Sequence, residues 1–102
     1  MEISSTSRDG NVVLAVAGEL DLHTVQMLLA AVTRALDTVP AVITIDAAEV
    51  TFADSAAVHG LLGARDAVVA RGATLRLTRV YGQVEQVLSM TGMDQIFEIV
   101  DS

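Results

Sequence analysis

The apolar residues of this chain fall into short runs that alternate with longer segments in which they recur every three or four positions. Short apolar runs rich in β-branched residues are typical of strands, and the longer spacing is typical of helices that bury one face. Residues 12–17 form a nearly continuous apolar run, which predicts a strand buried on both faces. The predicted strands cover residues 1–7, 12–17, 41–46, 73–78 and 96–100, the first of them as a weak edge strand.

Three segments have the spacing of amphipathic helices. The first follows Thr24, which we expect to cap it, and it ends before Pro40 because proline cannot continue a helix. The second covers residues 55–70, and Gly72 suits its C-terminal end. The third is short and ends at Gly92.

A turn over residues 8–11 connects the first two strands, and strands and helices then alternate. This order, β-β-α-β-α-β-α-β, predicts an α/β fold with a mixed, mainly parallel sheet of about five strands and about three helices packed on it. Right-handed crossovers place the loops that follow parallel strands along one edge of the sheet. The acidic loop over residues 18–23 and the connection over residues 47–54 should therefore lie near each other.

The composition fits one domain over residues 1–102, with an apolar fraction of 52% that supports a packed core. A net charge of −7 argues against binding to nucleic acid or to an anionic membrane, because both require basic side chains. The chain has no cysteine and no lysine, which excludes disulfides, thiol chemistry, Schiff bases and a P-loop. We expect a cytoplasmic protein, because no signal peptide and no apolar stretch of membrane length is present.

Few side chains suggest a cofactor site. The two histidines, His23 and His59, have no partner at metal-ligand spacing, so we expect neither a metal nor another cofactor.

The most informative polar pair is Asp54-Ser55, at the start of the second predicted helix. Backbone N–H groups point outward unpaired at a helix N-terminus, and the helix dipole favours negative charge there. A phosphate on Ser55 would therefore be tolerated. The alternative interpretation is that Ser55 is only the N-cap of the helix, a position that serine favours.

Three short motifs follow one another along the chain: Gly18-Glu19-Leu20-Asp21, Asp54-Ser55 before a leucine-rich helix, and Leu88-Ser89-Met90-Thr91-Gly92-Met93. Their combination resembles the STAS-domain anti-sigma factor antagonists of bacteria. The resemblance covers nearly the whole chain, although each motif is short. It implies a single STAS domain that works by binding a protein and is not an enzyme.

The resemblance also implies partners and residue roles. In that family the antagonist binds an anti-sigma factor and frees a sigma factor. The anti-sigma factor is also an ATP-dependent serine kinase that phosphorylates the antagonist and so breaks the complex, and a serine phosphatase restores it. In this chain Ser55 matches the phosphoacceptor and Asp54 the acid before it. Glu19 and Asp21 match the neighbouring loop that helps to form the docking face.

The chain departs from the family pattern after the serine. The family usually has Asp-Ser-Ser-Gly-Leu-Gly where this chain has Asp-Ser-Ala-Ala-Val-His, over residues 54–59. We expect Ala56, Ala57 and His59 to contact the partner. The methyl group of Ala57 stands where a partner backbone could approach closely, and alanine stiffens the first helical turn relative to glycine. Partner choice, or phosphorylation itself, could therefore differ from the usual case.

Two other functions are open on the sequence alone. A STAS accessory subunit of a lipid-transport or stressosome assembly would have no phosphoswitch, and the missing glycines favour it. A catalytic or receiver-like site could use Asp46, Glu49 and Asp54, but a receiver site would be expected to include a lysine, which this chain lacks.

Overall fold

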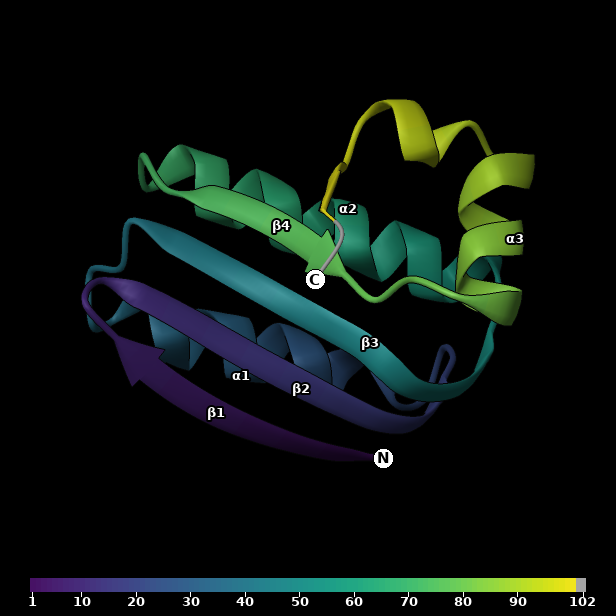
Figure 1. Ribbon diagram of the computed structural model, residues 1–102, viewed down its shortest axis with the longest axis horizontal. Coiled ribbons are helices and arrows are strands. Elements are labelled where there is room, and N and C mark those ends of the chain that lie inside the picture. Colours follow the sequence, from purple (N-terminus) through teal and green to yellow (C-terminus); the bar gives the residue numbers. More distant parts are fainter. Residues whose placement is uncertain (101–102) are drawn as a thin grey trace.

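The computed structural model of the chain describes residues 1–100, so the last two residues of the predicted domain, Asp101 and Ser102, lie outside the described part. None of the helices in residues 1–100 is long and apolar enough to cross a membrane. The elements are β1 (Glu2–Arg8), β2 (Asn11–Leu20), α1 (Val25–Leu36), β3 (Val42–Ala53), α2 (Ser55–Ala70), β4 (Thr74–Thr78), α3 (Gly82–Met90), the short 3₁₀ helix η1 (Met93–Gln95) and β5 (Glu98–Val100) (Figure 1).

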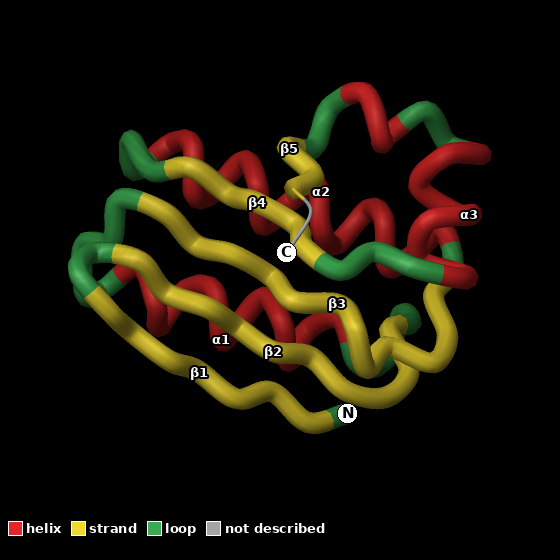
Figure 2. Tube along the Cα trace, in the orientation of Figure 1, coloured by secondary structure: helices red, strands yellow, loops and turns green. Residues whose placement is uncertain are grey.

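The predicted α/β fold is confirmed. The five strands form one sheet in the order β1-β2-β3-β4-β5, in which β1 is antiparallel to β2 and all other neighbours are parallel. Helices α1 and α2 lie behind this sheet, and α3 lies at the end where β3 finishes (Figures 1 and 2). The η1 turn between α3 and β5 is an addition that the apolar pattern did not predict.

The two long helices cover one face of the sheet only. In β2 the residues Val12, Leu14 and Val16 are buried, whereas Val13, Ala15 and Ala17 are only half-buried. The prediction that this strand is buried on both faces is therefore wrong. Alanine and valine tolerate partial exposure, so a nearly continuous apolar run does not by itself require a second layer of helices.

Strands β2 and β3 are longer than the sequence predicted. They continue through residues 18–20 and 47–53, which the sequence analysis placed in loops. These loop assignments are wrong because β2 and β3 keep pairing with each other beyond the end of β4, as far as Leu20 opposite Ala53. Register shifts interrupt the regular alternation in this extension, so the apolar pattern did not reveal it.

The predicted C-terminal end of α2 is confirmed. Gly72 has a φ of 78°, and its N–H donates to the carbonyl of Val69 at 2.9 Å. The N–H of Ala73 donates to the carbonyl of Val68 at 3.1 Å. Together these bonds form a Schellman motif, which requires a left-handed residue that glycine adopts without strain.

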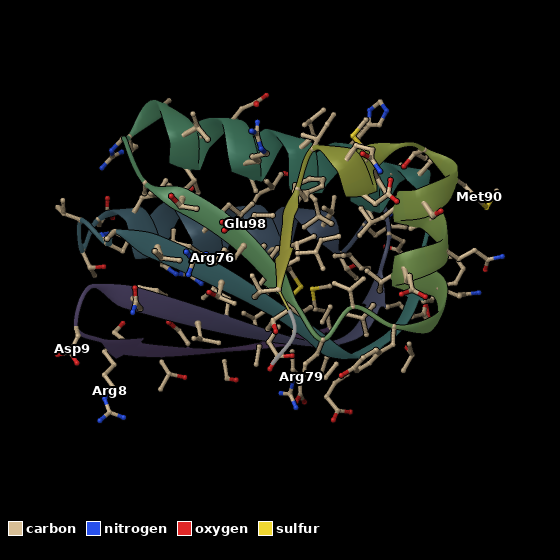
Figure 3. The ribbon with its side chains drawn as sticks, turned by 45° about the horizontal axis from the view of Figure 1, so that its top comes forward. Arg8, Asp9, Arg76, Arg79, Met90 and Glu98 are labelled. Atoms are coloured by element: carbon tan, nitrogen blue, oxygen red, sulfur yellow. The ribbon has the colours of Figure 1, made fainter. Side chains whose placement is uncertain are left out.

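Two ion pairs lie on or beside the sheet face that the helices leave open. Arg76 of β4 and Glu98 of β5 are 3.0 Å apart, and Arg79 pairs with Asp46 of β3 (Figure 3). Asp46 is buried, and the hydrogen bond from the Arg79 side chain lowers the pKa of its carboxyl group. Asp46 is therefore a carboxylate with a structural partner.

Helices α1 and α2 pack closely because Gly60 has no side chain. A methyl group at Gly60 would lie 2.0 Å from Cγ2 of Val25 in α1 and 3.2 Å from its Cβ. Valine has little rotamer freedom in a helix, so Val25 cannot easily turn away. The spacing of the two helices, and of the segments that lead into them, thus depends on glycine at position 60.

We expect Gly60→Ala to lower the free energy of unfolding by about 1–3 kcal/mol, because overpacking against Val25 outweighs the better helix propensity of alanine. Gly63→Ala is the matched control in the same helix, since a methyl group there would meet no atom within 4 Å. It should raise stability by about 0.5–1 kcal/mol. Urea unfolding measures both, and equal stabilisation by the two variants would contradict the close packing.

Candidate functional site

The first turn of α2 leaves the hydroxyl group of Ser55 free. Asp54 has an extended backbone (φ −128°, ψ −174°) and is the N-cap, and its Oδ1 accepts a hydrogen bond from the N–H of Ala57 at 3.0 Å. Ser55 is therefore the first helical residue, and the interpretation of Ser55 as the N-cap is wrong. Its side chain is exposed and forms no hydrogen bond within residues 1–100.

The loop after β2 is ordered by Asp21. Its Oδ1 accepts hydrogen bonds from the backbone N–H groups of His23 at 2.9 Å and Thr24 at 3.0 Å. These bonds, above all the one from Thr24, lower the pKa of the Asp21 carboxyl group, so that this side chain is ionised at neutral pH. The position of Glu19 is fixed in the same network, because its carbonyl accepts a hydrogen bond from the Thr24 hydroxyl at 2.7 Å.

Thr24 holds the N-cap position of α1, as predicted, but its side chain does not cap the helix. Thr24 has a helical backbone conformation, and its side chain makes no cap hydrogen bond. Its hydroxyl bonds backward, to the carbonyl of Glu19 and to the N–H and carboxylate of Asp21. Asp21 satisfies the N–H groups in the turn before the helix, a task that aspartate performs as well as threonine.

The two loops are neighbours, as the sequence predicted. Leu20 and Ala53 are paired across β2 and β3, so the segments that follow them leave the same edge of the sheet together. A groove of ≈ 470 Å³ opens between the helices that these segments begin. Its lining residues are Leu22, Val25, Gln26, Leu29, Ser55, Ala56, His59, Gly60 and Gly63.

The surface around the groove combines apolar side chains with acidic ones. Leu22 is 65% exposed and Leu29 is half-buried, and the carboxylates of Asp21 and Asp54 come directly before Leu22 and Ser55 in the chain. The side chain of Glu19 alternates with that of buried Leu20 and therefore points to the other face of the sheet. No arginine occurs in residues 9–33 or 35–64, and the chain contains no lysine. These segments therefore carry no side chain that would neutralise an added anion, apart from histidine.

The sequence profile of the STAS domain matches residues 2–102. This chain belongs to the STAS domain family. No significant match was found among curated protein sequences.

Several solved structures resemble this STAS domain. A Thermotoga maritima protein described as a candidate anti-sigma factor antagonist has 23% identity and a TM-score of 0.87, over 98% of this chain and 86% of its own. The phosphorylated form of the Bacillus cell fate determinant SpoIIAA has 21% identity and a TM-score of 0.74, over 99% and 91%. A sulfate transporter family protein of Wolinella succinogenes has 18% identity and a TM-score of 0.79, over 92% and 79%. At these identities the likeness establishes the shared fold.

The structure brings together three of the residues that sequence analysis selected in α2. Ser55, Ala56 and His59 line the groove, and Asp54 holds the helix start. Ala57 differs: it is 1% exposed, so its methyl group faces the core and does not present itself to a partner. The expectation that this methyl group alters a contact surface is therefore wrong.

One wall of the groove comes from α1 and the loop before it, and the sequence did not predict the residues of this wall. Leu22, Gln26 and Leu29 come from this part of the STAS domain, and Gly63 extends the α2 side. Ser55, His59 and Gly63 are spaced by four residues, which places them on one helix face, and this signal was available in the sequence. The contribution of Leu22 depends on how the two helices pack, which the sequence did not reveal.

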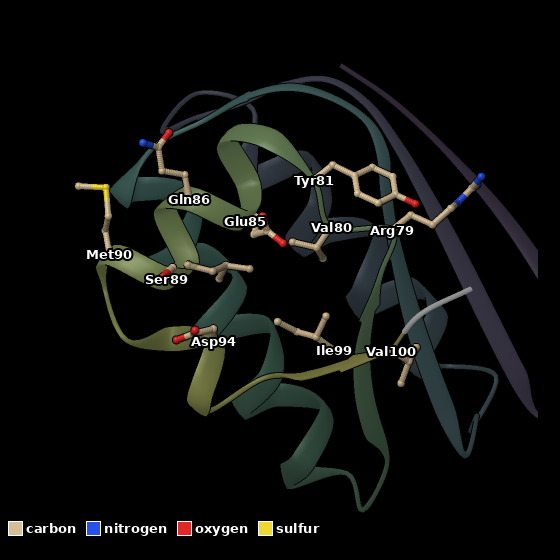
Figure 4. A pocket seen from close by; sticks show the side chains of 11 residues that line it. Arg79, Val80, Tyr81, Glu85, Gln86, Ser89, Met90, Asp94, Ile99 and Val100 are labelled. Carbon is tan, nitrogen blue, oxygen red and sulfur yellow. The ribbon is translucent and has the colours of Figure 1, made fainter.

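A second hollow, of ≈ 860 Å³, lies between α3 and β5 of the STAS domain (Figure 4). Leu88, Ser89 and Met90 of the third sequence motif are among its lining residues, but none of the predicted phosphoacceptor or partner-binding residues is. Its carboxylates come from exposed helical positions, so this hollow adds nothing to the chemistry of Ser55.

We expect the two residues at the start of α2 to differ in their effect on stability. Asp54→Ala removes the cap and should lower the free energy of unfolding by about 0.5–2 kcal/mol. Ser55→Ala should change it by less than about 0.5 kcal/mol, because the hydroxyl supports nothing in the fold. Asp54→Asn, which retains an acceptor oxygen, is the control. Urea unfolding of the three variants decides the assignment, and a loss in Ser55→Ala as large as that in Asp54→Ala would contradict it.

Proposed function

We propose that this STAS domain is an anti-sigma factor antagonist whose docking face surrounds Ser55 and whose binding is switched off by phosphorylation of Ser55. The observation that carries this proposal is the free, exposed hydroxyl of Ser55 at the first position of a capped helix beside an open groove. In this role the protein acts in the cytoplasm and catalyses no reaction itself.

In the unmodified state the groove binds the anti-sigma factor. Leu22 and Leu29 offer apolar surface, and Ala56 and His59 complete the wall beside Ser55. Asp21 and Asp54 form an acidic rim, which favours a partner that presents apolar side chains flanked by basic ones. Glu19 would contact the partner only if the docking face continues over the edge of the sheet. Ala57 supports this surface without being exposed on it. Its backbone N–H donates to Asp54, and its methyl group packs in the core.

The anti-sigma factor is also the proposed kinase. It would transfer the terminal phosphoryl group of bound ATP to the Ser55 hydroxyl, with release of ADP and of the hydroxyl proton. Exposure of Ser55 gives the kinase access without unfolding of α2. The helix N-terminus stabilises the phosphate once it is attached. A serine phosphatase would hydrolyse the ester and return the hydroxyl.

Phosphorylation opposes docking through charge. The phosphate adds about 1.5 to 2 negative charges at pH 7 beside Asp54 and close in the chain to no cationic side chain other than histidine. Docking would bury this charge next to the partner and next to the acidic rim, so desolvation and repulsion both weaken the complex. Each factor of ten in affinity corresponds to about 1.4 kcal/mol, which one misplaced phosphate readily exceeds.

A second candidate function is that of a STAS subunit of a larger assembly without a phosphoswitch. Ala56 and Ala57 in place of serine and glycine favour it, as does the likeness to the sulfate transporter family protein. The burial of Ala57 weakens this alternative, because its methyl group leaves the Ser55 surface unchanged.

Titration calorimetry with the anti-sigma-type serine kinases of the host, each purified separately, tests the proposal. We expect one of them to bind the unmodified STAS domain, and Ser55→Glu to weaken that binding by at least about tenfold. Ala70→Glu is the matched control, because it adds the same charge at an exposed position at the opposite end of α2 from Ser55. Binding that is equally strong in both variants, or that is absent for every kinase, would favour the subunit without a switch.

A further inference from the structure

We propose that the outer edge of β1 is the site at which a second copy of this chain binds, to form a symmetric dimer with one continuous sheet. β1 lies at the outer edge of the sheet, and no element covers its far side in residues 1–100 (Figures 1 and 2). An uncovered edge strand presents unpaired backbone donors and acceptors, which another strand can pair with.

The turn between β1 and β2 determines which backbone groups of β1 point outward. Asp9 and Gly10, with φ of 52° and 81°, form a two-residue turn, and Arg8 is paired with Asn11. The residues that flank such a turn exchange hydrogen bonds, and bonded and non-bonded pairs then alternate along the antiparallel ladder. Because this register is regular, the backbone N–H and C=O groups of the odd-numbered residues point to the free edge. These residues are Ile3, Ser5 and Ser7.

A second copy pairs all these outward groups when it lies antiparallel and is centred on Ser5. The two-fold axis then passes between the two Ser5 residues, and Ile3 of each copy lies opposite Ser7 of the other. In the same register Glu2 of each copy lies opposite Arg8 of the other. Opposite charges directly across two antiparallel strands attract, so symmetry produces this favourable pair twice.

The charged ends of β1 are free to form these pairs. Glu2 and Arg8 are exposed, and neither forms an ion pair within residues 1–100. Arg8 projects into solvent at the turn end of the strand (Figure 3). Because the strand has seven residues, its two ends are too far apart for Glu2 and Arg8 of one copy to reach each other.

β1 also lacks the features that usually keep an edge strand from pairing. It contains no proline and no lysine, its register against β2 has no bulge, and its central side chains are serine and threonine. The only charges stand at its two ends and have opposite sign, which favours self-pairing in one register.

The dimer uses no residue of the groove around Ser55. It therefore carries two docking faces, and it would give a partner with two binding sites a higher effective affinity than a monomer could. This inference does not depend on the proposed antagonist function, because the edge of β1 and its charges would pair equally in a STAS subunit without a phosphoswitch.

Sedimentation equilibrium of the full chain over a range of concentrations tests the dimer. We expect a reversible monomer–dimer equilibrium in the wild type that weakens as salt is raised. Glu2→Arg and Arg8→Glu should each weaken it by about tenfold, because each places like charges across both ends of the pairing. Asp37→Arg and Arg71→Glu are matched controls with the same charge changes at exposed positions outside β1, and they should leave it unchanged.

The mixture of the two β1 variants is the decisive measurement. Glu2→Arg mixed with Arg8→Glu restores opposite charges at both ends, so a heterodimer should form about as tightly as the wild-type dimer. The double variant should dimerise alone for the same reason. A wild type that stays monomeric at millimolar concentration, or single variants that dimerise as tightly as the wild type, would overturn the proposal. Circular dichroism melting curves verify that each variant is folded.

Discussion

The hydrogen bond from the N–H of Ala57 to the carboxylate of Asp54 determines what the start of α2 can do. Because Asp54 caps the helix, Ser55 has no structural task, and its hydroxyl is available for chemistry. The same bond holds Ala57 in place while its methyl group packs into the core. Asp54 therefore stabilises the start of the helix, and the neighbouring Ser55 can be modified without loss of this cap.

The extension of β2 and β3 beyond the rest of the sheet gives this helix start its neighbours. Because β2 and β3 pair as far as Leu20 and Ala53, the Asp21 loop and the Asp54 cap begin side by side at the same edge of the sheet. Close packing at Gly60 then brings α1 against α2, so the groove has a wall from each helix. Sheet register, helix packing and capping therefore act together to expose a serine beside an apolar groove with an acidic rim.

The sequence predicted the elements that apolar periodicity can encode, including all three helices and the order of the strands. It failed in residues 47–53, where Val50, Thr51 and Phe52 favour a strand but the pairing of β3 with β2 has to be known before the strand can be extended this far. It also expected the side chain of Thr24 to cap α1, whereas Asp21 accepts the N–H bonds before this helix, because Asp and Thr are nearly equivalent caps. Ser55, Ala56 and His59 of α2 line one groove, but Leu22 could be added only once the helices were placed.

The central claim is that Ser55 carries a phosphate in the living cell, and peptide mass spectrometry of the protein isolated from its host tests this most directly. The account predicts a phosphorylated peptide at Ser55 whose occupancy changes with growth or stress, and loss of the phosphorylated protein in a Ser55→Ala strain. A Ser55 that stays unmodified under all these conditions would contradict the switch and leave a STAS domain that binds its partner constitutively.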